Sequence, residues 1–143
     1  MPLHLEAFAE GLGFPEGPIA ISDGSIVFVD ILKQTLCRAQ ASGKVDSVAA
    51  LGGGPNGAAV GPDGAVYVCN NGGVYTFVDA NGGKIPGPRP AGFKGGSIQR
   101  VDLATGKFET LYDSFEGAPL MTPDDIVFDR SGGFWFTDMG LQD

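Results

Sequence analysis

A repeat that occurs three times is the feature that most limits how this chain can fold. Residues 15–30, 55–70 and 123–138 align with one another without gaps. Each copy begins with proline, has an Asp-Gly or Ser-Gly pair in its middle, and ends with Asp or Asn. Internal repeats at spacings of tens of residues are the signature of propellers, solenoids and related arrays. The chain is therefore expected to be built from repeated structural units.

Each copy of the repeat predicts a β-hairpin. A short apolar strand precedes the Asp-Gly or Ser-Gly pair and a second strand follows it, and glycine accepts the positive φ of tight hairpin turns. The second strands, residues 26–29, 66–68 and 134–136, are continuously apolar. Strands of that kind are covered on both faces. We therefore expect the hairpins to pack between neighbouring sheets.

Further strands complete the repeated units. Strand-like segments at 35–39 and 45–50 follow the first copy, and segments at 97–102 and 108–112 follow the second. A four-stranded unit of about 40 residues is typical of a propeller blade. The sequence thus predicts an all-β fold, an incomplete β-propeller over residues 1–143 with blade units near 15–54, 55–112 and 123–143. A short strand at residues 3–8 is also expected to complete a blade.

The spacing between copies predicts a long loop in the second unit. The first two copies start 40 residues apart and the last two start 68 residues apart, and the excess falls in the Gly- and Pro-rich segment 82–96. Loops longer than about 12–15 residues are uncommon in compact domains and often act as lids or binding elements. A passive surface insertion is the alternative.

The predicted units, about two and a half blades, are too few to close a propeller, which typically has about four to eight blades. The chain is therefore expected either to belong to a longer polypeptide or to self-associate, because open blade edges invite pairing with another chain.

Composition excludes several classes of partner. The net charge is −8, with 9 Lys and Arg residues against 17 Asp and Glu. This leaves no basic stripe for a nucleic acid or an anionic membrane surface. No stretch approaches the roughly 18 apolar residues of a membrane span, so a soluble, cytoplasmic protein is expected. Cys37 and Cys69 lie beside apolar strands without metal-site spacing and are predicted to be buried free thiols.

The second residue of each copy is the strongest functional signal. These residues are Glu16, Asn56 and Asp124. Innermost propeller strands begin near a common axis, so equivalent side chains from successive blades should converge. Carboxylate and amide oxygens are the ligands that Ca²⁺ and Mg²⁺ prefer, and the pattern predicts a divalent cation site. The alternative is that each side chain only hydrogen-bonds a local turn.

Two further sets of polar residues accompany this position. Asp30, Asn70 and Asp138 close the three copies and are predicted to cap the turns that follow. Asn71 lies in the loop Asn70-Asn71-Gly72-Gly73 and is a candidate for a pocket.

Several short motifs resemble those of one family. They are Phe14-Pro15-Glu16-Gly17-Pro18, Phe28-Val29-Asp30-Ile31, Pro55-Asn56-Gly57, Gly61-Pro62-Asp63-Gly64, Pro123-Asp124-Asp125 and Trp135-Phe136-Thr137-Asp138. The chain resembles, over essentially its whole length, the N-terminal half of the senescence marker protein, gluconolactonase and luciferin-regenerating enzyme family. The resemblance implies a six-bladed propeller with one divalent metal ion in its channel, Ca²⁺ first and Zn²⁺ or Mg²⁺ as alternatives, and hydrolysis of sugar lactones without an organic cofactor.

The resemblance also implies roles for individual residues. Glu16 matches a metal ligand, and Asp124 stands where the family has a second ligand, Asn. Asn56, Asn71 and Asp125 are assigned to substrate binding. The family's base comes from later blades, so no catalytic residue is assigned here. The expected reaction has the metal polarise the lactone carbonyl while a carboxylate activates water. The extra charge of Asp124 would weaken that polarisation, so a non-catalytic, metal- or ligand-binding propeller is the alternative.

Overall fold

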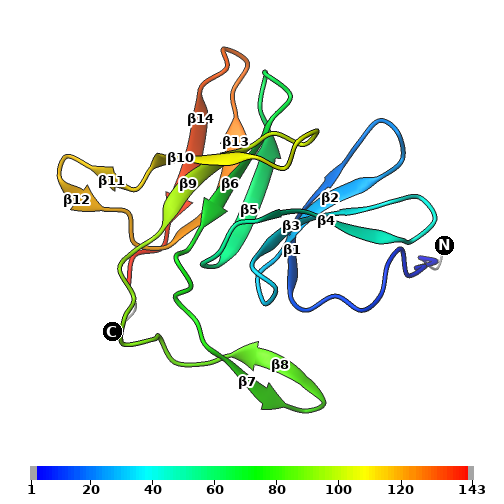
Figure 1. Ribbon diagram of the computed structural model, residues 1–143, viewed down its shortest axis with the longest axis horizontal. Coiled ribbons are helices and arrows are strands. Elements are labelled where there is room, and N and C mark those ends of the chain that lie inside the picture. Colours follow the sequence, from blue (N-terminus) through cyan, green and yellow to red (C-terminus); the bar gives the residue numbers. More distant parts are fainter. Residues whose placement is uncertain (1–2, 142–143) are drawn as a thin grey trace.

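The computed structural model describes residues 3–141 and shows three antiparallel sheets side by side (Figure 1). The first sheet contains β1 (Pro15–Ala20), β2 (Ile26–Asp30), β3 (Thr35–Ala39) and β4 (Val45–Ala50), in that order. The second contains β5 (Pro55–Val60), β6 (Val66–Asn70), β9 (Ser97–Val101) and β10 (Phe108–Tyr112). The third is the hairpin of β13 (Pro123–Phe128) and β14 (Phe134–Asp138). The predicted all-β, partial propeller fold is confirmed.

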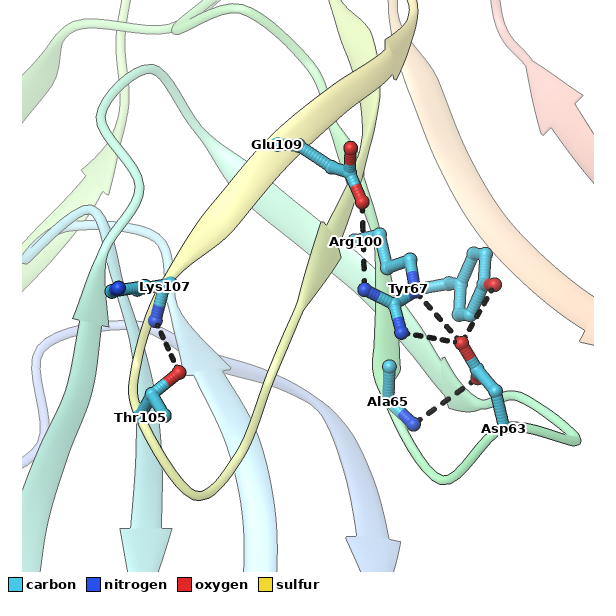
Figure 2. A network of polar contacts seen from close by, with 7 residues as sticks. All are labelled: Asp63, Ala65, Tyr67, Arg100, Thr105, Lys107 and Glu109. Carbon is cyan, nitrogen blue, oxygen red and sulfur yellow. Dashed lines mark hydrogen bonds and ion pairs between the residues drawn. The ribbon is translucent and has the colours of Figure 1, made fainter.

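Each repeat forms a hairpin whose first strand is the innermost strand of its sheet. These strands, β1, β5 and β13, contact one another in sequence, with β5 between the other two. In the first two repeats, an arginine from the neighbouring strand pairs with the Asp of the hairpin turn. Arg100 contacts Asp63 at 2.7 Å and Glu109 at 3.4 Å (Figure 2). Arg38 pairs with Asp23 in the same way in the first sheet.

Alternating side chains on the second strand of each hairpin build two cores. Val27 and Val29 of β2 meet Val66 and Val68 of β6 between the first and second sheets. On the other face of β6, Cys69 packs with Ile98, Leu120 and Ile126, and Phe134 and Phe136 of β14 lie against this cluster. Both faces of β2 and β6 are therefore covered, as predicted.

The prediction of two covered faces is wrong for β14. Trp135 is 72 % exposed and its cross-strand neighbour Val127 is 62 % exposed. No other segment within residues 3–141 packs on this face. The apolar run alone could not reveal this, because a strand's second face is buried only where another sheet supplies the cover.

The expected strand at residues 3–8 is absent, since these residues have no regular structure. Instead, Ala9 and Leu12 from the same N-terminal segment pack against Phe28 and Cys37 on the outer face of the first sheet. In this segment the carbonyl of Gly11 accepts a hydrogen bond of 2.7 Å from Nζ of Lys33, in the turn between β2 and β3.

Both cysteines are buried free thiols, as predicted. Burial raises the pKa of Cys37. Burial, reinforced by the negative charges of Asp125, Asp124 and Asp138, raises the pKa of Cys69 to about 12. Neither thiol is therefore a nucleophile at neutral pH, because reactivity requires the thiolate.

The segment 82–96, expected to be a loop, begins with a strand. β7 (Phe77–Ala80) and β8 (Gly83–Pro86) form a separate hairpin that projects from the sheets (Figure 1). Its two-residue turn is Asn81-Gly82, and both residues have positive φ, 50° and 80°. A further short pair, β11 (Ser114–Phe115) and β12 (Ala118–Pro119), lies before the third repeat. The part of the chain that the structure describes contains no helix able to cross a membrane.

Candidate functional site

The site is built at the starts of the three innermost strands, where each carries a β-bulge. In β5, Pro55 pairs with Asn70 and Ala58 pairs with Val68, so three steps along one strand match two along its partner. The same shift follows the start of β1 and of β13. A bulge adds one unpaired residue and redirects the neighbouring side chains. The second residue of every repeat lies at this irregularity.

Glycines at the third position of the first two repeats allow the innermost strands to approach closely. A Cβ added to Gly17 would lie 2.8 Å from the backbone nitrogen of Ala58, and one added to Gly57 would lie 2.6 Å from Cα of Asp125. Gly17 also has a positive φ of 54°. No larger side chain fits at either position without moving backbone. The small residues thereby bring the starts of the three strands together.

A cavity of about 550 Å³ opens at this junction and is lined by all five residues that the sequence assigned to metal or substrate binding. They are Glu16 from β1, Asn56 from β5, Asn71 after β6, and Asp124 and Asp125 from β13. Three repeats, spread over more than 100 residues of sequence, thus contribute to one cavity. Their roles as ligands remain predictions.

Two of these residues are in direct contact. The Nδ2 of Asn56 donates a hydrogen bond of 2.5 Å to Oδ1 of Asp124. This bond fixes the Asn56 amide and leaves Oδ2 of Asp124 for another partner. Asp125 is exposed, and its Oδ1 accepts a bond of 2.8 Å from the backbone N–H of Ile126. Glu16 is also exposed.

Asn71 is the most deeply buried of the five, with an exposed fraction of 1 %. Its Oδ1 accepts bonds from the backbone N–H groups of Gly73, at 3.0 Å, and Val74, at 3.4 Å. These bonds orient the amide, yet its Nδ2 is buried without a hydrogen-bond partner within residues 3–141. Leaving a buried donor unpaired costs about 1–3 kcal/mol. A ligand oxygen in the cavity would remove that cost.

The closing residues of the repeats hold the backbone around the site and do not line the cavity. Asp30 accepts hydrogen bonds from the N–H groups of Gly13, Phe14 and Lys33, at 2.8, 3.0 and 3.1 Å. Burial by itself would raise the pKa of Asp30, but these bonds outweigh it and keep that pKa below its ordinary value.

The other two closing residues act alike. Oδ1 of Asn70 accepts from Gly54 and Gly72, and Asp138 accepts from Met121, Thr122 and Gly140. The expected capping of the following turn is thus observed, and the same side chains also fix the segment before each repeat.

The donors in the cavity suit a hard cation in kind, although they are few. Glu16, Asp124 and Asn56 offer carboxylate and amide oxygens, which Ca²⁺ favours. Within the described residues, no group of three or more His, Cys, Asp or Glu side chains is close enough to hold an ion. An ion bound here would need further oxygens from water, substrate or other protein groups.

Sequence reasoning missed the apolar residues of the cavity. Phe14, Ile31, Tyr75, Phe77, Pro86 and Met139 line it together with the acidic residues. Phe14 is the first residue of the Phe14-Pro15-Glu16-Gly17-Pro18 motif, but nothing in that motif indicates that its ring lines the cavity. Phe77 and Pro86 belong to the β7–β8 hairpin, and the Asn81-Gly82 pair between two apolar runs was the signal that could have located it.

Comparison with known proteins agrees with this architecture. A gluconolactonase of Zymomonas mobilis subsp. mobilis is 24 % identical over 148 residues, covering 94 % of this chain and 35 % of that protein. The structure of a gluconolactonase from Xanthomonas campestris superposes with a TM-score of 0.69 at 23 % identity, over 92 % of this chain and 37 % of that one. An inactive virginiamycin B lyase from Staphylococcus aureus, solved with quinupristin, gives 0.59 at 17 % identity, covering 87 % and 34 %.

The chain therefore spans little more than a third of the length of these relatives. The family model for the SMP-30/Gluconolactonase/LRE-like region matches residues 14–143. That match includes all three repeats and every residue assigned to the cavity. The chain belongs to the SMP-30/gluconolactonase/LRE-like family.

Proposed function

We propose that this chain supplies part of the active site of a metal-dependent lactonase, which hydrolyses a sugar lactone to the open hydroxy acid. The observation that carries the proposal is the convergence of Glu16, Asn56, Asn71, Asp124 and Asp125 on one cavity. Membership of a family with gluconolactonases among its relatives supports the same reaction.

Glu16 and Asp124 would hold the metal ion, for which Ca²⁺ is the first candidate. Both offer hard carboxylate oxygens. Asn56 orients Asp124 through its 2.5 Å hydrogen bond and partly offsets its negative charge. When bound, such an ion would act as a Lewis acid towards a lactone carbonyl. Glu16 belongs to the first repeat and Asp124 to the third, and Asn56 of the second repeat lies between them in the order of the innermost strands.

Asn71 is suited to bind the substrate. Its Nδ2 is a buried donor without a partner in the described chain, and its orientation is fixed by the bonds to Gly73 and Val74. A lactone oxygen that accepts from Nδ2 would be held in one position beside the carboxylates. Asp125, at the exposed rim, can accept a bond from a substrate hydroxyl. Positioning of this kind lowers the entropic part of a reaction barrier.

The proposal is tested by Ca²⁺ titration and by hydrolysis of glucono-δ-lactone, followed in a pH-stat with Ca²⁺ or with EDTA. Glu16→Gln should weaken Ca²⁺ binding roughly tenfold or more, because one of two carboxylate ligands is lost. Glu10→Gln, an exposed position that does not line the cavity, is the matched control. Equal Ca²⁺ affinity in both variants and in the unmodified chain would show that Glu16 is not a metal ligand.

A second candidate is ligand binding without turnover. It is favoured by the small number of carboxylates near one another and by Asp124, whose charge would reduce the pull of an ion on a carbonyl. Calcium-dependent binding of gluconolactone with no acid released in the pH-stat would select this candidate.

A further inference from the structure

Six of the side chains that line the cavity, here called the apolar wall, are largely hydrocarbon, and half of them are aromatic. Phe14, Tyr75 and Phe77 form it together with Ile31, Pro86 and Met139. The lining also carries the carboxylates of Glu16, Asp124 and Asp125, and no Lys, Arg or His is among the described residues that line the cavity. Even with a divalent cation bound, three carboxylates leave a net negative charge without a basic partner, which disfavours an anionic substrate.

Hydrogen bonds within the base of the β7–β8 hairpin extend it, and an aromatic contact joins it to the segment before β1. At its base, Thr76 donates through its backbone N–H to Pro88 at 3.1 Å, and Gly87 donates to the carbonyl of Thr76 at 2.7 Å. The Thr76 hydroxyl also donates to Pro88 at 2.8 Å. On the propeller side, the ring of Phe77 packs on Phe14 with centroids 5.6 Å apart. Phe77 thereby contacts the motif Phe14-Pro15-Glu16-Gly17-Pro18, which contains Glu16.

One face of this hairpin lines the cavity, and the other face is exposed. Phe77 pairs across the hairpin with Pro86, and both line the cavity. Val78 pairs with Ile85 on the alternate face, and these side chains are 42 % and 46 % exposed and line no part of it. Alternation along a strand therefore separates a cavity face from an outer face. Val78 is a natural control for Phe77.

The wall offers few hydrogen-bond partners to a ligand, since among its side chains only that of Tyr75 carries a polar group. A fully hydroxylated substituent placed there would lose bonds to water without replacing them. An apolar substituent would instead gain about 0.8 kcal/mol for each buried methylene.

We propose that the β7–β8 hairpin sets substrate preference, so that the site takes uncharged lactones bearing an alkyl, acyl or aryl substituent in preference to fully hydroxylated ones. This inference rests on the proposed lactonase function and changes its preferred substrate from a fully hydroxylated sugar lactone to a lactone with an apolar substituent. The lactone ring would lie beside Asn71 and the acidic residues, with its substituent against Phe77, Tyr75 and Phe14. Phe77 is the specificity-determining residue in this arrangement.

The test uses γ-lactams bearing methyl, butyl or hexyl groups, which resist hydrolysis and so report binding separately from turnover. We expect Kd, measured by calorimetry in Ca²⁺, to fall roughly fourfold for each added methylene. Phe77→Ala should remove most of this dependence, and Val78→Ala should keep it. Affinity that is independent of chain length in the unmodified protein, or equal losses in the two variants, would overturn the proposal.

The same experiment separates this inference from the proposed function. If glucono-δ-lactone and alkyl lactones release no acid but the lactams show the expected dependence on chain length, the lactonase assignment fails and the apolar binding wall stands. If lactones are hydrolysed but affinity does not depend on chain length, hydrolysis stands and the preference is rejected. Far-UV circular dichroism confirms that each variant is folded.

Discussion

The first and third repeats share one sequence pattern and meet different surroundings. Val27 and Trp135 occupy the same position in the two copies, and Val27 is fully buried whereas Trp135 is 72 % exposed. In the first repeat, β6 packs over this face, and residues 9 and 12 cover the opposite one. In the third repeat, only the face towards the second sheet is covered. Burial is therefore set by the neighbouring sheet, and the repeat pattern alone does not determine it.

The closing residues show the same contrast. Asp30 and Asp138 each accept three backbone hydrogen bonds at equivalent places. Asp30 is fully buried, and Asp138 is exposed. Three backbone bonds in each of two environments allow the effect of burial to be compared, although Asp30 has in addition an ion pair of 3.4 Å with Lys33.

The largest expected effect comes from placing a charge at the shared strand position. Val27→Glu would bury an unpaired carboxylate between the first and second sheets and should cost about 4 kcal/mol or more, enough to unfold a marginal domain. Trp135→Glu leaves the charge in water and should change the free energy of unfolding by only about 0.5 kcal/mol. Urea unfolding of the two variants checks this. Similar losses would show that the outer face of β14 is buried in solution.

Replacing the closing carboxylate by its amide should have a smaller and pH-dependent effect. We expect Asp30→Asn to cost roughly 1.5–3 kcal/mol near neutral pH, because bonds to an ionised acceptor are lost. In the second repeat, Nδ2 of Asn70 donates to Oε1 of Gln99. The matching position in the first sheet is Cys37, which provides no such oxygen.

The sign of the pH dependence follows from the lowered pKa of Asp30. A folded pKa below the unfolded value of about 3.9 gives stability that is complete above about pH 4 and is lost as pH falls through the folded pKa. The difference in the free energy of unfolding between the unmodified chain and Asp30→Asn should therefore shrink at about pH 3. Asp138→Asn, at the exposed equivalent, should show a cost well under 1 kcal/mol. A gap that is constant with pH would show that Asp30 is not ionised in the fold.

Much of this fold could be predicted because the signals are local and repeated. The Asp23-Gly24 and Asp63-Gly64 turns and the apolar runs beside them specify hairpins, and three aligned copies specify a propeller. The convergence of Glu16, Asn56 and Asp124 followed from the fold's geometry. Position within a repeat thus indicated which side chains share a cavity, without any knowledge of their contacts.

The apolar wall could not be predicted in this way because the β7–β8 hairpin lies outside the repeat. Its Asn81-Gly82 turn was available as a local signal, but nothing in the sequence states that Phe77 packs on Phe14, more than 60 residues earlier. The unpaired Nδ2 of Asn71 depends likewise on bonds made by its own loop. Contacts between non-equivalent segments are decided by tertiary packing.

The smallest expected effect concerns association through the open side of the third repeat. β14 has no partner other than β13 within residues 3–141, and Trp135 and Val127 form an exposed apolar surface beside its free edge. Free edges and apolar patches favour pairing with another chain. We expect the isolated chain to self-associate, and Trp135→Glu to weaken the dimer roughly tenfold, about 1.4 kcal/mol. Sedimentation velocity over a concentration series measures this, with Phe115→Glu, at an exposed aromatic residue on β11, as the control. A monomer at every concentration would show that neither the free edge nor the apolar patch is sufficient for association. The difference in burial between the first and third repeats would then affect folding only.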